Sequence, residues 1–157
     1  MINQLHIKDF VRASALAIIA LVALASCVEP RISEEFKPKS DRDSIGRFCF
    51  EVDMSDSLKT YDITFYTRLD CGSSTFILLQ DIPVNVEFVS PSGESFAEDV
   101  FLAKDRFVPV SAGTYDAKVD YRTGCVPVEY GRWNMNITVP EVRGMRGWGI
   151  VVSSKRL

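Results

Sequence analysis

From Arg47 onward, apolar residues recur at every second position, and this alternation limits the possible folds more than any other feature of the chain. Phe48, Phe50 and Val52, for example, alternate with polar or charged residues. Successive side chains of a strand point to opposite faces of a sheet, so a period of two predicts strands with one buried face. The pattern predicts about eight strands, the later ones covering 61–69, 84–88, 100–102, 115–121, 133–139 and 148–152.

The predicted strands are separated by turn residues, most clearly at Ser90-Pro91-Ser92-Gly93. Pro91 presets φ at the second position of the turn and Gly93 adopts a positive φ at little cost, so we expect a hairpin here. Segment 148–152 is mostly apolar on both faces, which is typical of a central strand. The sequence therefore predicts an all-β fold, an antiparallel β-sandwich of either immunoglobulin-like or jelly-roll type.

Residues 1–26 have the composition of a secretory signal peptide, with Lys8 and Arg12 preceding an uncharged apolar run. That run, of roughly 14 residues, is shorter than the ~20 that a membrane-spanning helix needs. Leu24-Ala25-Ser26-Cys27 resembles the lipobox of bacterial lipoproteins, which predicts that Cys27 is acylated and becomes the mature N-terminus. Several acyl chains on one residue give stable membrane anchoring. The alternatives are a plain secretory signal with a chance cysteine, or a short membrane anchor.

Beyond the signal peptide, about 130 residues remain, the usual size of one domain. Segment 27–46 contains two prolines and many charges without a sustained period, which predicts a lipidated tether, followed by a β-sandwich domain over 47–157. Val28 follows Cys27, so the aspartate that retains some lipoproteins in the inner membrane is absent. We therefore expect a lipid-anchored protein of the outer membrane.

The residue inventory argues against most enzymatic mechanisms. The only histidine, His6, leaves with the signal peptide, so the mature chain cannot use a Ser-His-Asp or Cys-His mechanism and lacks the commonest zinc ligand. Carboxylate-only hydrolysis would need two facing acids, and no such pair is marked in the sequence. A net charge of −3 argues against nucleic acid as a partner. We expect a protein without enzymatic activity, cofactor or metal.

The cysteines and acidic residues are best explained by structure or solubility. Cys71 and Cys125 each adjoin a glycine, which suits loop ends, and they are the predicted disulfide pair, although three cysteines allow three pairings. Cys49 is then the free thiol. Glu98 and Asp99 lack the spacing and turn glycine of a calcium-binding loop, which favours a solvated sheet rim.

The aromatic residues offer the best candidates for a contact surface, since Trp and Tyr favour both sugar and protein binding. Trp133 and Trp148 share the parity of the apolar positions that follow them, which predicts core positions. Tyr66 lies on the polar face of its predicted strand, together with Arg68. Tyr66, Arg68 and Tyr130 are therefore the predicted surface-contact residues.

Four segments of the mature chain together resemble a known family. They are the strand ending in Arg68 (61–68), the turn at 90–93, the strand opened by Gly131-Arg132-Trp133, and the closing Gly147-Trp148-Gly149-Ile150. In this order they are similar to the gliding-motility lipoprotein H (GldH) family of Bacteroidota.

This resemblance implies a lipid-anchored envelope accessory without enzymatic activity, associated in gliding relatives with motility and the linked protein-secretion machinery. The family often has an aromatic and asparagine-containing segment where this chain has 75–79, so a role in secretion or envelope assembly is the more transferable inference. The leading hypothesis is a non-enzymatic envelope lipoprotein that contacts another envelope protein. The alternative is a β-sandwich lipoprotein that binds glycan or peptidoglycan through exposed aromatic rings.

Overall fold

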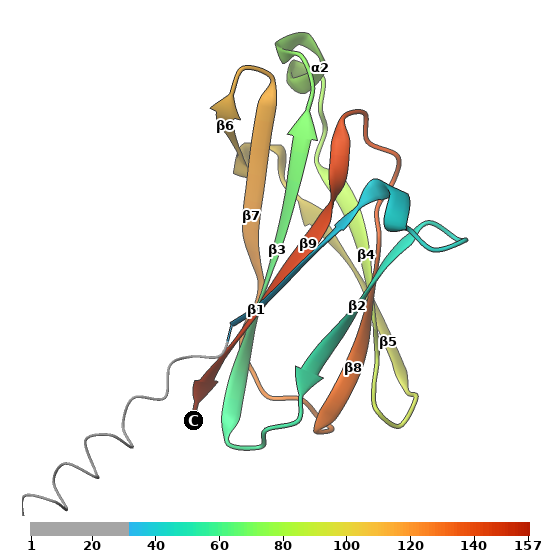
Figure 1. Ribbon diagram of the computed structural model, residues 1–157, viewed down its shortest axis with the longest axis vertical. Helices are drawn as coiled ribbons and strands as arrows, with labels where there is room; N and C mark the ends of the chain where they lie inside the picture. Colours follow the sequence, from blue (N-terminus) through green and yellow to red (C-terminus); the bar gives the residue numbers. More distant parts are fainter. Residues whose placement is uncertain (1–31) are drawn as a thin grey trace, which may run out of the picture. The chain divides into compact units, whose positions relative to one another are not determined.

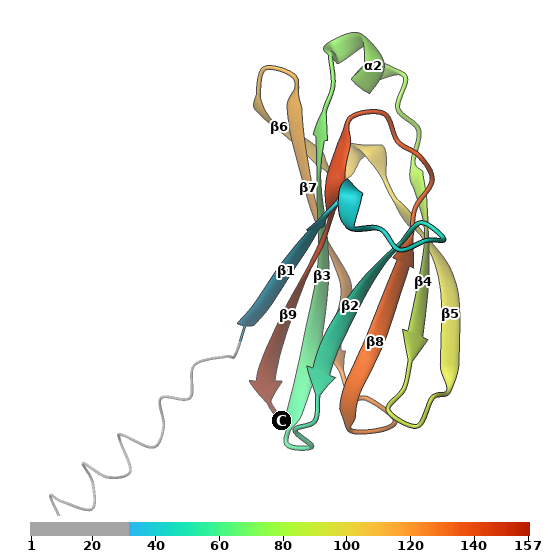
Figure 2. The same ribbon diagram turned by 45° about the vertical axis from the view of Figure 1, so that its right-hand side comes forward.

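The computed structural model describes residues 32–157, which form two antiparallel β-sheets packed face to face (Figures 1 and 2). The five-stranded sheet has the order β1 (Ile32–Pro38), β9 (Met145–Arg156), β3 (Lys59–Asp70), β7 (Thr114–Cys125), β6 (Phe107–Ser111). The four-stranded sheet has the order β2 (Arg47–Met54), β8 (Gly131–Thr138), β4 (Ile82–Val89), β5 (Ser95–Leu102). This confirms the predicted all-β sandwich.

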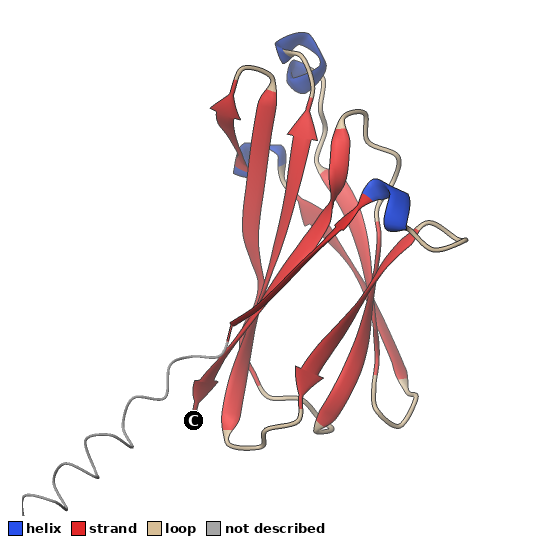
Figure 3. Cartoon of the chain, in the orientation of Figure 1, coloured by secondary structure: helices blue, strands red, loops and turns tan. Residues whose placement is uncertain are grey.

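Helical structure is confined to short connecting segments of the described chain, drawn blue in Figure 3. They are α2 (Ser73–Ile77) and two 3-10 turns, η1 (Lys39–Asp41) and η2 (Lys104–Arg106). Within residues 32–157 we find no helix with the length and apolar character needed to cross a bilayer.

The core lies between the two sheets, and in strands such as β2 and β3 it is built from the residues of one parity, whereas β9 is buried on both faces around Trp148. Phe48 and Val52 of β2, Ile63 of β3, and Met135 and Ile137 of β8 are almost completely buried there. Trp133 and Trp148 are buried as well, which confirms their predicted core positions. Residues 32–157 thus contain both sheets and one continuous core, which is the usual basis of a domain that folds independently.

The predicted turn joins β4 to β5. The Gly93 N–H donates to the Ser90 carbonyl at 2.9 Å, and Gly93 has a φ of +93°. Most residues other than glycine avoid this region, so the sequence places the flexible residue where the hairpin requires it. The central-strand prediction for 148–152 is also confirmed, because β9 pairs with β1 on one side and β3 on the other.

The sandwich begins earlier than predicted, because β1 lies inside the segment interpreted as a tether. Its residues pair with β9 in register from Ile32 opposite Ser153 to Pro38 opposite Gly147. An edge strand with mostly exposed side chains has no need for apolar alternation, so its charged sequence looked like linker. The signal peptide, Cys27 and the first residues of the tether lie outside the described residues.

The predicted disulfide between Cys71 and Cys125 is not formed, and Cys49, Cys71 and Cys125 are all free thiols. Cys125 lies opposite Tyr61 near the start of β3, whereas Cys71 follows Asp70 at the end of the same strand. The stretch from Tyr61 to Asp70 spans about 30 Å at roughly 3.3 Å per residue. A disulfide needs Cα atoms within about 7 Å, so the pairing was wrong. Sequence spacing does not reveal that the two cysteines lie at opposite ends of the sandwich.

Candidate functional site

The predicted contact residues Tyr66 and Arg68 lie on the outer face of the five-stranded sheet, in a hollow that we call the outer tray. Its lining residues come from four neighbouring strands: Glu34, Phe36, Tyr66, Thr67, Arg68, Asp70, Asp116, Ala117, Lys118, Arg146 and Val151. The hollow has a volume of about 590 Å³, within the roughly 300–1,000 Å³ typical of ligand sites.

Strand register brings the aromatic residues of the tray together. Phe36 of β1 and Tyr66 of β3 both lie opposite Gly149 of β9, from its two sides, and Tyr66 lies opposite Lys118 of β7. Phe36, Gly149, Tyr66 and Lys118 therefore form one row across the sheet. Because Gly149 has no side chain, the space above its backbone, between Phe36 and Tyr66, is open to the side chain of a neighbouring strand.

The Tyr66 ring occupies that space. A Cβ placed on Gly149 would meet the tyrosine ring closer than van der Waals contact allows, with Cε2 only 2.7 Å away, so the ring lies over the β9 backbone. The ring centroids of Phe36 and Tyr66 are 5.6 Å apart and their planes differ by 29°. Phe36 is 40% exposed and Tyr66 is half-buried, so the two rings form an apolar platform open to solvent.

Ion pairs flank this platform. The Arg68 guanidinium donates from Nε and Nη2 to the two carboxylate oxygens of Asp116, each at 2.7 Å, in a bidentate arrangement. Arg146 donates from Nε to one carboxylate oxygen of Asp70. Arg68 lowers the pKa of the Asp116 carboxyl, and Arg146 lowers that of Asp70. The two aspartates of the tray, Asp70 and Asp116, are therefore ionised and paired at neutral pH.

The Tyr66 hydroxyl is held in its protonated form. Partial burial, together with a hydrogen bond to the Glu34 carboxylate, raises the pKa of Tyr66 to about 12. Glu34 and Phe36 are two residues apart and so lie on the same face of β1. The edge strand therefore supplies both the ring that lies beside Tyr66 and the carboxylate that accepts its hydrogen bond.

Sequence reasoning found only part of this site. Tyr66 and Arg68 lie in the tray, but Tyr130, which is exposed, lies in the loop before β8 and is not among the lining residues. Phe36 was missed because its strand was interpreted as tether. Asp116 and Arg146 were missed because only register brings β7 and β9 beside Arg68 and Asp70. The role of Tyr66, Arg68 and Tyr130 in surface contact stays a prediction.

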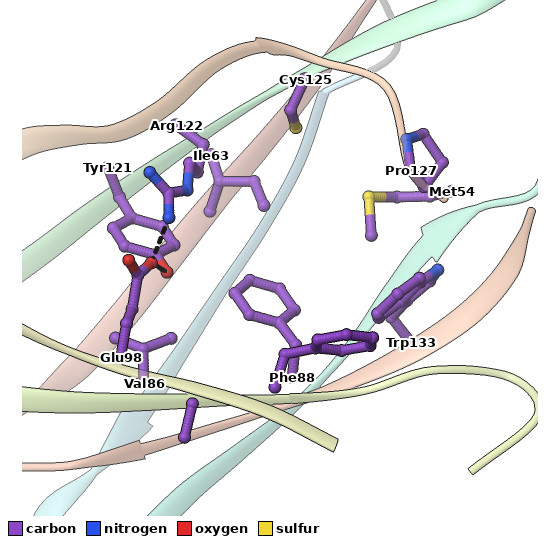
Figure 4. A pocket seen from close by; sticks show the side chains of 12 residues that line it. Met54, Ile63, Val86, Phe88, Glu98, Tyr121, Arg122, Cys125, Pro127 and Trp133 are labelled. Carbon is purple, nitrogen blue, oxygen red and sulfur yellow. Dashed lines mark hydrogen bonds and ion pairs between the residues drawn. The ribbon is translucent and has the colours of Figure 1, made fainter. Parts of the chain in front are cut away.

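A second hollow, the inter-sheet pocket, opens between β5 and β7 and has a volume of about 280 Å³ (Figure 4). Its lining is mostly apolar: Met54, Ile63, Val86, Phe88, Phe96, Ala97, Glu98, Tyr121, Arg122, Cys125, Pro127 and Trp133. Figure 4 shows Glu98, Tyr121 and Arg122 together at one end and Phe88, Met54 and Trp133 toward the other. Within residues 32–157, no three His, Cys, Asp or Glu side chains converge as a metal site would require.

Comparison with protein-family models finds no match, and neither does comparison with curated proteins. Among solved structures, one similar chain is a protein of Sulfurospirillum deleyianum, at 10% identity and a TM-score of 0.40, covering 82% of this chain and 100% of that one. Another is TmCBM61, a carbohydrate-binding module solved in complex with β-1,4-galactotriose, at 13% identity and a TM-score of 0.34. That match covers 83% of this chain and 90% of the other. Similarity at this level assigns the chain to no family.

Proposed function

We propose that this protein is a non-catalytic lipoprotein of the outer membrane that binds a glycan in the outer tray. The observation that carries the proposal is the position of the Tyr66 ring, spread over Gly149 beside the exposed ring of Phe36. The membrane anchor follows from the lipobox at Cys27 and is part of the proposal.

The platform has the geometry needed to stack against a sugar ring. An aromatic face carries negative charge density, which attracts the weakly positive C–H bonds on one side of a pyranose ring. Phe36 and Tyr66 offer two such faces, at an interplanar angle of 29°. The volume of the tray leaves room for a ligand that covers both rings.

The electrostatics of the tray favour an uncharged ligand rich in hydroxyl groups. Arg68 and Asp116 already neutralise each other, as do Arg146 and Asp70. Glu34 and Lys118 add one charge of each sign, so the lining carries no net charge. This favours a neutral ligand, and sugar hydroxyls can add hydrogen bonds to the remaining lone pairs and N–H groups.

The same acids fit binding better than hydrolysis. A glycoside hydrolase needs one carboxyl group with a raised pKa that acts as general acid. In the tray, the pKa values of Asp70 and Asp116 are both lowered by their arginine partners. This supports a site that holds a glycan without cleaving it.

A second candidate function is contact with a protein of the motility, secretion or envelope-assembly machinery. Two segments that resemble the GldH family, 61–68 and 147–150, lie on β3 and β9, and Tyr66 pairs with Gly149 and Arg68 with Gly147. Two of the four segments that carry the resemblance therefore lie at the tray. Tyr and Arg also dominate protein interfaces energetically, which makes the tray a suitable contact surface.

A binding experiment on soluble protein that begins at Val28 tests the glycan proposal. The protein, its Tyr66→Ala variant and a matched Tyr130→Ala control would be applied to an array of neutral oligosaccharides and peptidoglycan fragments. We expect Tyr66→Ala to weaken binding by at least about tenfold and Tyr130→Ala to leave it unchanged. Equal binding by all three proteins would contradict a role for the tray.

Crosslinking in cells separates the two candidate functions. A photo-reactive residue would replace Arg68 in the anchored protein, with Cys27→Ala as the unanchored control. Capture of a defined envelope protein, lost in the control, would support the second candidate in place of glycan binding.

A further inference from the structure

We propose that the inter-sheet pocket binds one linear acyl chain, which enters between β5 and β7. This pocket is separate from the outer tray, since the two have no lining residue in common, and the proposal does not depend on glycan binding.

The pocket exists because the last strand of the five-stranded sheet is short. Within residues 32–157, β7 has β3 on one side and β6 on the other. The pairing of β6 with β7 ends at Ala117. Residues 118–125 of β7 therefore pair with β3 on one side and, within the described chain, have no strand on the other. Tyr121, Arg122 and Cys125 of this stretch line one side of the pocket, and Phe96 and Glu98 of β5 line the other.

The inner part of the pocket is apolar and aromatic. Phe88 and Phe96 both contact Trp133, with ring centroids 6.3 Å and 6.2 Å apart, respectively. The indole N–H of Trp133 donates to the Glu129 carbonyl at 2.9 Å, so it leaves no unpaired donor for a polar ligand. The Cys125 thiol likewise donates to the Tyr61 carbonyl, at 3.0 Å. The inner walls thus offer surface contact without free hydrogen-bonding partners.

The polar groups gather at the solvent side. Glu98 lies at an inward-facing position of β5, opposite the buried Val86, which is unusual for a carboxylate. It accepts hydrogen bonds from the Tyr121 hydroxyl and the Arg122 guanidinium (Figure 4). The side chains of Glu98 and Arg122 are 37% and 50% exposed, so this cluster remains in contact with water and can face a polar head group.

This distribution selects an acyl chain over a peptide or a sugar. Every peptide unit or sugar ring brings donors and acceptors, and burying them without partners is costly. A hydrocarbon chain has none to satisfy. A cavity of about 150 Å³ holds benzene, so 280 Å³ has room for roughly eleven carbon atoms at the same density.

The test is a binding series with straight-chain fatty acids, measured by calorimetry and by tryptophan fluorescence, to which Trp133 in the pocket contributes. We expect affinity to rise from butanoate to about dodecanoate and then to level off, because longer chains extend into water. A short-chain phospholipid in parallel shows whether the pocket also accepts an acyl chain from a lipid. Absence of saturable binding, or an affinity that keeps rising with chain length beyond the capacity of the pocket, would overturn the proposal.

Two substitutions at one position link binding to the pocket. Cys125→Phe fills the space and should weaken decanoate binding at least about tenfold, whereas Cys125→Ser keeps the space and should bind like the unaltered protein. Phe96→Trp, at a half-exposed wall position, is a second filling variant if Cys125→Phe does not fold. Decanoate binding that is equal in the filled and unfilled proteins, with native circular dichroism in both, would show that the chain binds elsewhere.

Discussion

Replacement by alanine should destabilise the protein at one glycine of β9, Gly147, and leave its stability nearly unchanged at another, Gly149. A methyl group on Gly149 would meet only the outer atoms of the Tyr66 ring. A methyl group on Gly147 would meet the backbone of β1, including Pro38 Cα at 2.8 Å. A tyrosine side chain can rotate away, whereas a paired backbone cannot move without separating the two strands.

The expected magnitudes follow from these collisions. Replacing a strand glycine by alanine stabilises the folded protein by roughly 0.5–1 kcal/mol, because alanine lowers the conformational entropy of the unfolded chain. At Gly149 this offsets a rotamer change of about 0.5–1.5 kcal/mol, so the free energy of unfolding should stay within about 1 kcal/mol. At Gly147 the displaced edge strand should cost about 1–3 kcal/mol, as overpacking typically does.

Urea denaturation of the soluble protein, followed by tryptophan fluorescence, measures both changes. Gly149→Ala should keep the midpoint and yet lose binding in the outer tray, because the Tyr66 ring has been displaced. Gly147→Ala should lower the midpoint at an unchanged denaturant slope. The reasoning would be refuted if Gly149→Ala destabilised the protein as much as Gly147→Ala.

Three further predictions concern acid stability, the cysteines and the core. Arg47 and backbone N–H groups lower the pKa of Asp43 to about 2, below its ordinary value of 3.8, so its contribution to stability should be present above about pH 4 and lost as the pH falls toward 2. The difference in urea midpoint between the protein and Asp43→Asn should shrink accordingly; a constant difference would contradict this. Thiol titration of denatured, unreduced protein beginning at Val28 should label Cys49, Cys71 and Cys125, and two missing thiols would reveal a disulfide. Trp148→Ala should cost about 3–5 kcal/mol by urea denaturation and Trp148→Phe clearly less, because the buried indole N–H has no acceptor; equal costs would count against this account.

The alternation in β2, β3 and β8 was sufficient to predict buried positions such as Phe48, Ile63 and Met135, because each strand has one face in the core. The same rule failed for β1. The edge strand β1 is held by backbone hydrogen bonds to β9, and most of its side chains are exposed. Backbone hydrogen bonds do not require apolar residues at alternate positions, so the sequence of β1 shows no strand pattern. The predicted start of the domain was therefore late, and Phe36 was left out of the candidate site.

The sequence by itself determined the all-β class, the parity of the core, the β4–β5 turn and the outward position of Tyr66 and Arg68. These depend on local backbone geometry and on the alternation of side chains along one strand. Only the tertiary structure decided that Phe36 and Tyr66 meet over Gly149, that Arg68 pairs with Asp116, and that Cys71 lies far from Cys125. These relations depend on strand order and register, which are decided when residues far apart in the chain pack their apolar faces into one core.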